Sequence, residues 1–525
     1  MTLATPAAMR PFALPQSFYN ATLDRHYSIA TSGESVVESE WQLDANGHEV
    51  FRDTHPLRWL IGADANGFGG LVDRHGYLTE APASYFPAIG RWDLSPGYQR
   101  GDYGFNRTIA SGCIFCHSGR PRPMQGDLGK YDEPAFSQLA IGCENCHGPG
   151  AAHVAAMNAG KLWPSGKDPT VVNPAHLGRK RADEICMSCH QTGDARAFEP
   201  GKSYLDFRPG QPLSRVLAIL MVPPTQDHPP SRDHVQHYYS MVLSKCYRAS
   251  LSQPAARQMR CITCHDPHVE PTRAEAPAWF NRKCMQCHTR ASCTAPVALR
   301  RATTPGDNCI ACHMPKRDDL ALSHSALTNH RIVRMPDEPF PAETFRQTTA
   351  ALPDLIYLDG DALDGEAGGQ AKPSPLTLLE AYNQLRHDHP QYQPSYDNLL
   401  TKLAAAQPEN ATVLARLGHR EWRQGLTTDA QRDLLRAAAL DPDQPAVYAD
   451  LSAIRAHLGD AQSAIAYARQ AERLDPFNAR RRHDLVLRLI DAQQYPQAVT
   501  AMKQFLAEFP EDDFLRKALA IAEQP

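Results

Sequence analysis

Six copies of the pattern Cys-x-x-Cys-His constrain this 525-residue chain more than any other feature. They use twelve of its fourteen cysteines. The pattern is typical of covalent c-type haem attachment. Structural zinc and thioredoxin-like redox sites also use Cys-x-x-Cys, but neither requires a histidine directly after every pair. The sequence therefore predicts six haem c groups. Their attachment cysteines are Cys113 and Cys116, Cys143 and Cys146, Cys186 and Cys189, Cys261 and Cys264, Cys284 and Cys287, and Cys309 and Cys312.

Each motif supplies three of the bonds that hold its haem. The two cysteines form thioethers with the haem vinyl groups, and the adjacent histidine reaches the iron as the proximal ligand. The ligand on the other face of the iron decides what the haem does. A second histidine gives an iron that only transfers electrons, whereas an open position can bind a substrate. The expected proximal ligands are His117, His147, His190, His265, His288 and His313.

Twelve further histidines lie outside both the motifs and the C-terminal repeats, so the chain can supply a second ligand to every iron. Four of them stand where a neighbouring haem needs a ligand, namely His153, His268, His324 and His330. One of three neighbouring histidines, His228, His234 and His237, is expected to be a further ligand, and we select His228. The sequence alone leaves open which iron each histidine completes.

Two cysteines, Cys246 and Cys293, fall outside the motifs. In an oxidising compartment such a pair favours a disulfide. Two separate thiols are equally compatible with the sequence, because the sequence does not give the distance between them. A thiolate bond to an iron is a third, sharper alternative.

We expect a mainly α-helical protein with four zones. Residues 1–110 carry short strand-like runs between Gly- and Asp-rich turns, which predicts a small β-rich unit. Residues 111–335 hold all six motifs and are expected to form loops and short helices around closely packed haems. Residues 336–375, rich in Pro, Asp and Gly, are interpreted as a linker. Residues 376–525 are expected to form an α-solenoid.

The solenoid prediction rests on a strict period. Pro408, Pro442, Pro476 and Pro510 are spaced by 34 residues, and small residues recur with the same spacing. This period is the tetratricopeptide pattern. Two amphipathic helices cannot bury their apolar faces alone, so neighbouring pairs stack and form a surface suited to binding a partner. A redox partner protein is the expected occupant.

Charge and hydropathy limit the other partners. The formal net charge of −4 gives no basic field for nucleic acid. No apolar run is long enough to be a transmembrane segment, and peripheral membrane association stays open.

Haem attachment of this kind follows export, so we expect a periplasmic or otherwise exported protein. The first twenty residues, MTLATPAAMRPFALPQSFYN, are not a signal sequence, because no apolar stretch follows a basic segment. The chain is then expected to be in its mature form, or to begin downstream of the natural start.

Several stretches resemble a known group of proteins: GCENCHGPGAAH, MRCITCHDPH, KCMQCH, DNCIACHMPK and SHSALTNHRI. They are similar to multihaem cytochromes related to the tetrahaem cytochrome and hydroxylamine oxidoreductase of ammonia oxidisers. They are more similar to exported multihaem proteins fused to tetratricopeptide repeats. The resemblance covers residues 18–335 and the repeats. It implies closely packed haem pairs, with His153, His268 and His330 as distal ligands.

The resemblance also implies a departure from the group. Relatives commonly carry one more motif upstream, after a signal sequence. The group's pattern therefore implies a seventh haem site missing before residue 1, and His26 as a ligand left without its haem.

Three functions remain open at this point. The leading hypothesis is electron transfer along six haems, with the repeats docking a redox partner. The second is an oxidoreductase in which one open haem acts on a small nitrogen or sulfur compound, so whether the chain is an enzyme is undecided. The third is a scaffold, in which the repeats are the main function.

Overall fold

A computed structural model of the chain describes residues 1–62, 67–101, 103–124, 126, 128–190, 193–227, 229, 237–303, 306–318, 324, 326–335, 338–345, 355–358 and 372–523. The chain forms two compact units. The first consists of residues 1–140 together with 391–525, and the second of residues 141–390.

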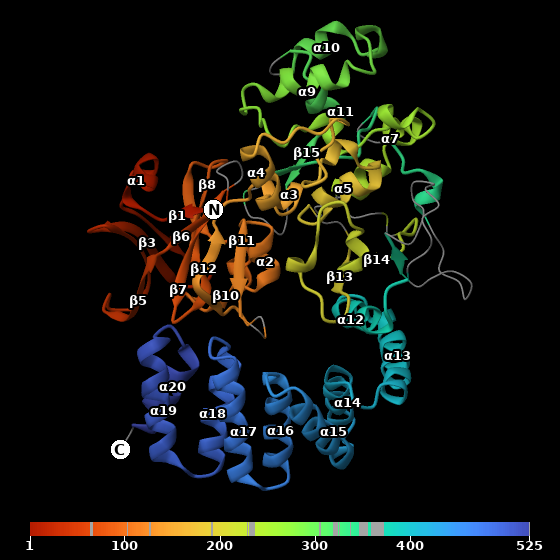
Figure 1. The fold of residues 1–525 in the computed structure, drawn as a ribbon. Coiled ribbons are helices and arrows are strands. Elements are labelled where there is room, and N and C mark those ends of the chain that lie inside the picture. Colours follow the sequence, from red (N-terminus) through yellow and green to blue (C-terminus); the bar gives the residue numbers. More distant parts are fainter. Residues whose placement is uncertain are drawn as a thin grey trace. The chain divides into compact units, whose positions relative to one another are not determined.

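The first unit begins with two antiparallel sheets (Figure 1). The four-stranded sheet is a meander of β2 (Gln16–Asn20), β3 (Arg25–Ser32), β4 (Ser35–Leu43) and β5 (Glu49–Leu57). Side chains of β3 alternate between buried and partly exposed, as expected for a strand with one face on a core. The six-stranded sheet contains β1 (Thr2–Leu3), β6 (Trp59–Gly62), β7 (Phe68–Arg74), β8 (Tyr77–Phe86), β9 (Arg91–Leu94) and β10 (Arg107–Thr108).

Apolar residues of both sheets and of α1 (Pro6–Met9) form one core, including Met9, Ile29, Val36, Phe68 and Trp92. The prediction of β structure near the N-terminus is therefore confirmed.

The β-rich part continues beyond residue 110, where the sequence suggests a boundary. The short helix α2 (Ser111–Phe115) carries the first motif, and β11 (Arg120–Pro123) pairs with β12 (Tyr131–Gln138). Ile114, between the two motif cysteines, is fully buried in a cluster with Tyr131 and Phe136. The first motif is thus part of the first unit because its own helix contributes to the β-rich core.

The C-terminal region is a tetratricopeptide-type solenoid of paired antiparallel helices (Figure 1). The first helices of successive pairs begin at Ala411, Pro445 and Ala479, which repeats the 34-residue period. The pairs are α14 (Ala411–Arg423) with α15 (Thr427–Leu440), α16 (Pro445–His457) with α17 (Ala461–Leu474), and α18 (Ala479–Asp491) with α19 (Tyr495–Glu508). They are flanked by α13 (Gln393–Ala406) and α20 (Asp513–Ala522).

Small residues allow the helices of each pair to approach closely. Ala430, Ala464 and Ala498 are at most 1% exposed. A Cβ atom on Gly418 would lie 2.6 Å from Leu434 Cγ, closer than packing permits. The recurring small residues in the sequence therefore mark helix contacts.

The last repeat is anchored to the β-rich part of the same unit by Arg74. Its guanidinium lies 4.9 Å and 5.0 Å from the ring centroids of Phe477 and Phe509. It also donates a hydrogen bond of 2.8 Å to the carbonyl oxygen of Glu508. Glu511 accepts a hydrogen bond from the side chain of Asn106. Segments from both ends of the sequence therefore share one folded unit.

The second unit is built around a small sheet of β13 (Ala195–Phe198), β14 (Leu217–Met221) and β17 (Ile356–Tyr357). The strand β17 lies in the stretch expected to be a linker, and residues 355–358 are buried. The rest of that stretch is only partly within the described residues. Helix α12 (Pro375–Leu385) packs on β13.

The second unit also contains short elements, five of which carry or directly precede the remaining motifs. They are α3 (Cys143–His147), α4 (Ala151–Asn158), α5 (Arg179–Met187), α6 (His237–Val242), α7 (Lys245–Ser250), α8 (Cys261–Cys264), α9 (Ala276–Cys284), α10 (Val297–Arg301) and α11 (Cys309–His313), with the hairpin β15 (Lys316–Asp318) and β16 (Ala326–Thr328).

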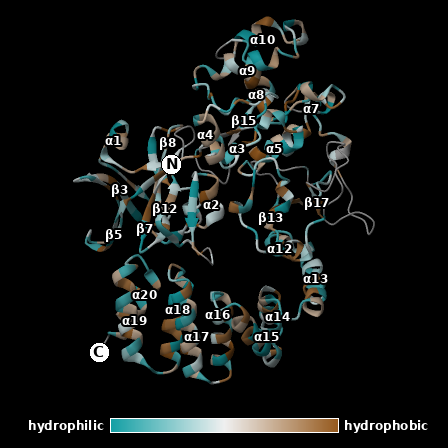
Figure 2. Ribbon diagram, viewed as in Figure 1, coloured by the Kyte–Doolittle hydropathy of each residue, from teal (hydrophilic) through white to brown (hydrophobic). Residues whose placement is uncertain are grey.

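Figure 2 shows apolar and polar residues interspersed along these helices. In the part of the chain that the structure describes, no helix has the length and hydropathy needed to cross a bilayer.

Candidate functional site

The six motifs lie on or at the end of short helices. Cys143, Cys146 and His147 share the single turn of α3, and Cys309, Cys312 and His313 share α11. Side chains three and four residues apart lie on the same face of a helix. Both sulfurs and the imidazole of such a motif can therefore reach one porphyrin.

Two proximal histidines are oriented by backbone carbonyl groups. The Nδ1 atom of His147 lies 2.7 Å from the carbonyl oxygen of Val172, and that of His313 lies 2.7 Å from the carbonyl oxygen of Val333. A hydrogen bond at Nδ1 fixes the tautomer and leaves Nε2 free for a metal. Contacts remote in sequence from the two motifs therefore leave both imidazoles able to bind a metal through Nε2.

Three of the proximal histidines face a second histidine. The ring centroids of His147 and His268 are 6.0 Å apart, and their planes differ by 20°. Those of His265 and His330 are 6.2 Å apart. A metal bound at about 2 Å from a nitrogen of each ring would place two centroids about 6 Å apart. Both pairs therefore have the spacing of two axial ligands on one iron.

The third pair involves His237, which starts α6. Its ring centroid is 5.6 Å from that of His190 and 4.3 Å from that of His330. Burial, reinforced by the neighbouring imidazoles, lowers the pKa of His237 to about 3. Burial likewise lowers the pKa of His330 to about 4. Neutral imidazole is the form that binds a metal.

Of the three histidines His228, His234 and His237, the structure describes only His237. His237 lies among the paired histidines, whereas His228 lies outside the described residues. Tyr238, Tyr239 and Met241 follow His237 into the hydrophobic core and fix the start of α6.

The Nδ1 atom of His153 lies 2.6 Å from Asp168 Oδ2, which leaves its Nε2 free. His324, His288 and His117 are exposed.

The ring of His26 lies between those of Tyr19 and Trp41 on the four-stranded sheet, at centroid distances of 4.7 Å and 5.2 Å. Its two faces are thus already in contact with aromatic neighbours.

The stretches that hold the second, fourth, fifth and sixth motifs have no described apolar core of their own. Between Tyr247 and Val333, and again between Phe136 and Ala182, no described hydrophobic side chain is buried. Helix α4 contains Val154 and Met157, which are 54% and 43% exposed. Folded segments need buried apolar surface to offset the loss of chain entropy. A large planar apolar group held by the motifs fits this composition, so the residues present are suited to haem.

The third and fourth motifs contact each other through a residue that the sequence did not single out. Asp183, on α5, accepts a hydrogen bond of 2.9 Å from the backbone N–H of Cys261. Burial raises the pKa of Asp183 to about 6. The thiols of Cys186 and Cys261 also share a hydrogen bond. No local sequence pattern marks Asp183 as a functional residue, because its partner, Cys261, is 78 residues away.

The two cysteines outside the motifs are separate thiols. Cys246 is half-buried and donates a hydrogen bond of 3.4 Å to Ser244 Oγ, and Cys293 is exposed. Of the alternatives left open by the sequence, the disulfide is absent from the structure. Among the described residues, no three His, Cys, Asp or Glu side chains converge as a metal cage would require.

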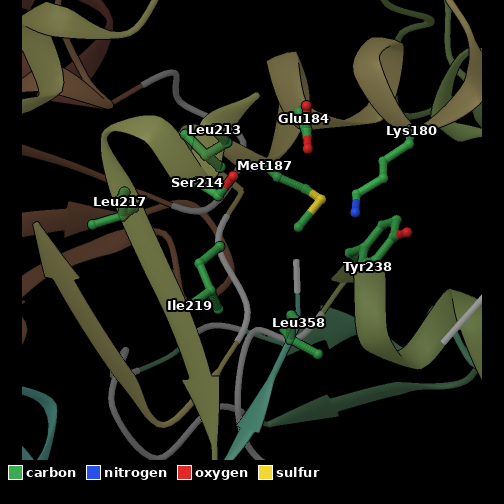
Figure 3. A pocket seen from close by; sticks show the side chains of 9 residues that line it. All are labelled: Lys180, Glu184, Met187, Leu213, Ser214, Leu217, Ile219, Tyr238 and Leu358. Atoms are coloured by element: carbon green, nitrogen blue, oxygen red, sulfur yellow. The ribbon is translucent and has the colours of Figure 1, made fainter. Parts of the chain in front are cut away.

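A small cavity of about 20 Å³ lies beside the third motif. Figure 3 shows Met187 and Lys180 of α5 and Tyr238 of α6 directed toward it, against a wall that includes Leu217 and Ile219. A volume of this size holds about one water molecule. The cavity is therefore too small for a substrate larger than water.

Comparison with known proteins gives no match to a protein-family model and none to a curated protein. Solved structures that resemble part of the chain are repeat proteins. MamA is 20% identical over 28% of this chain and 80% of its own, with a TM-score of 0.25. A thermophilic tetratricopeptide repeat protein of Thermus thermophilus is 20% identical over 28% of this chain and 81% of its own, with a TM-score of 0.24. The Cut9–Hcn1 structure is 18% identical over 29% of this chain and 30% of its own, with a TM-score of 0.26.

Proposed function

We propose that this protein is an exported, periplasmic multihaem c-type cytochrome that transfers electrons along six covalently bound haems. The observation that carries the proposal is the repetition of Cys-x-x-Cys-His six times, with each motif on or at the end of a short helix. Two features support it independently of the motif. They are the spacing of the paired imidazoles and the absence of buried apolar side chains, among the described residues, in the stretches that hold the second, fourth, fifth and sixth motifs.

Haem supplies a one-electron couple whose potential depends on its axial ligands. The protein contributes the geometry of those ligands. His268 faces the proximal His147, and His330 faces the proximal His265. Histidine on both faces leaves no position for a substrate, which suits electron transfer.

The solenoid is the proposed docking surface for a redox partner protein. Tetratricopeptide-type helix pairs expose side chains of successive repeats along one surface, and such surfaces commonly bind other proteins. The last repeat is anchored to the β-rich part by Arg74, Phe477 and Phe509. The earlier repeats are therefore proposed as the partner's site.

The test is an optical and electron paramagnetic resonance titration of the full chain, produced with its haems. Haem content measured by absorbance and mass should be six per chain, one for each motif. All haems should be low-spin and should not bind carbon monoxide, nitrite or hydroxylamine. A content near zero would refute the cytochrome proposal. If one haem is high-spin and binds one of these ligands, electron transfer is not the sole function. The protein would then be the second candidate, an oxidoreductase that acts at that haem.

A further inference from the structure

The third and fourth motifs are held side by side within the second unit. Asp183 joins α5 to the first residue of α8 through the backbone N–H of Cys261, at 2.9 Å. The guanidinium of Arg260 donates a hydrogen bond of 3.5 Å to the carbonyl oxygen of Leu177. The side chains of Cys186 and Cys261 meet between the two helices. Each of these contacts joins the two motifs without requiring a haem.

Four imidazoles form a cluster in this unit, and three ring contacts connect them in sequence. The order is His190, His237, His330 and His265, with successive centroid distances of 5.6 Å, 4.3 Å and 6.2 Å. The outer two are the proximal ligands of the third and fourth motifs. The two longer steps leave room for a metal between the rings, which requires about 6 Å. The middle step is too short for a metal and is a direct ring contact.

We infer that the third and fourth haems form one contacting pair, in which His237 completes the iron bound by His190, His330 completes the iron bound by His265, and the two distal imidazoles touch. The inference rests on the proposed function, and it specifies which two of the six haems are most closely coupled for electron transfer. When an electron crosses this pair, one haem is oxidised and the other is reduced, and no bond is formed or broken.

The alternative that His237 and His330 bind the same iron is excluded by their spacing. Their centroids are 4.3 Å apart, whereas two rings on one iron need about 6 Å. Both rings are also positioned by the fold. His237 begins a helix whose Tyr238 and Tyr239 are buried, and the Nδ1 atom of His330 lies 3.0 Å from the carbonyl oxygen of Thr328. Each imidazole can therefore serve a different haem.

The experiment compares His237→Ala, His330→Ala and the double variant in the full chain carrying its haems. A matched control is His176→Ala, because His176 is an exposed histidine of the same unit. The readouts are haem content, the number of high-spin haems by electron paramagnetic resonance, and carbon monoxide binding. We expect six haems in every protein. Each single variant should gain one high-spin haem, the double variant two, and the control none.

Contact between the rings predicts a second effect. His237→Ala should shift the low-spin signal of the haem that keeps His330, and His330→Ala should shift that of the haem that keeps His237. The variant His237→Met keeps a side chain that can bind iron. If His237 is a ligand, the haem it completes should stay low-spin in this variant and change its midpoint potential. This test remains usable if the alanine variant folds poorly.

Two results would overturn the pairing. One is that His237→Ala and His237→Met leave every haem signal unchanged. The other is that the double variant gains only one high-spin haem, because both histidines would then serve one iron. If the wild-type protein carries six low-spin haems and the variants give either result, the proposed function stands and only the assignment of His237 and His330 as ligands is wrong. If the wild-type protein carries no haem, the proposed function itself is wrong.

Discussion

The solenoid and the motif-bearing stretch from Tyr247 to Val333 are both helical, but they differ in what their helices bury. Every helix of the three solenoid pairs, α14 to α19, buries at least two of its own side chains. The helices α8 to α11 bury none. The solenoid thus supplies its own apolar core, whereas the described side chains of the motif stretch supply none, which is what the proposed haems would provide. We therefore expect that one region can be destabilised without changing the stability of the other.

The largest expected effect is the loss of haem itself. Protein produced without haem attachment should lose hydrogen-exchange protection across residues 248–330, because the described side chains there supply no apolar core. The solenoid should keep its protection, because its helices pack on one another. Hydrogen exchange followed by mass spectrometry of haem-free and haem-loaded protein measures both regions at once. If residues 248–330 are equally protected in the haem-free and haem-loaded forms, this stretch does not need haem to fold, and the proposed difference between the two regions is wrong.

The reverse perturbation removes part of the solenoid core. Leu451 on α16 is fully buried, so Leu451→Ala should lower the free energy of unfolding of this region by about 2–5 kcal/mol. Haem content and haem spectra should stay as in the wild type. Leu440→Ala is the matched control, since Leu440 is 46% exposed and should change stability little. Thermal unfolding followed by circular dichroism reports the difference, and altered haem spectra would show that the two regions are not separable.

A pH effect is expected where the last repeat meets the β-rich part. Burial raises the pKa of Glu511 from 4.5 to about 7. Because folding favours its neutral form, its stabilising contribution is complete below about pH 4.5 and is lost as pH rises through about 7. A shift of this size corresponds to at most about 3 kcal/mol.

Glu511→Gln should therefore reduce the fall in melting temperature between pH 5 and pH 8, as measured by thermal scans across about that range. Asp53, Arg482, Arg74 and Arg516 are charged groups that interact with Glu511. Burial also raises the pKa of Glu80 and Glu38, so the informative quantity is the difference between variant and wild type. An unchanged pH profile in the variant would assign the effect to these other carboxyl groups.

The smallest effect is expected at Cys246. Cys246→Ser should change the free energy of unfolding by no more than about 0.5 kcal/mol and leave six haems in place, because Cys246 is outside the motifs and unpaired. Cys264→Ser, in the fourth motif, is the contrasting variant and should lose one covalent attachment. Loss of a haem from Cys246→Ser would instead indicate that this thiol is an iron ligand.

The parts of the fold that follow a local pattern were predictable. The 34-residue period located the solenoid, because each repeat contacts only its neighbours and therefore leaves a periodic trace in the sequence. The β-rich beginning was also predictable, but its extent was not. Ile114 lies in a motif and gives no sign, in sequence, that it packs against Tyr131 and Phe136.

The residues of the candidate site also fall into a predictable group and an unpredictable group. The attachment cysteines and proximal histidines follow from a five-residue pattern, and they stay predictions until haem is measured. The choice of His237 and the role of Asp183 depend on partners 47 and 78 residues away. Single-sequence reasoning cannot supply such contacts, because they arise from packing of the small sheet, α5 and α6.

The anchoring of the last repeat by Arg74 also has a consequence in polymer terms. Since residues 1–140 and 391–525 fold together, the intervening 250 residues, 141–390, form a closed loop whose two ends are tied to the same unit. Tying the ends removes conformations from the unfolded loop, by an entropy that grows only as the logarithm of loop length. The segment that carries five of the six motifs is thus confined at both of its ends by the first unit.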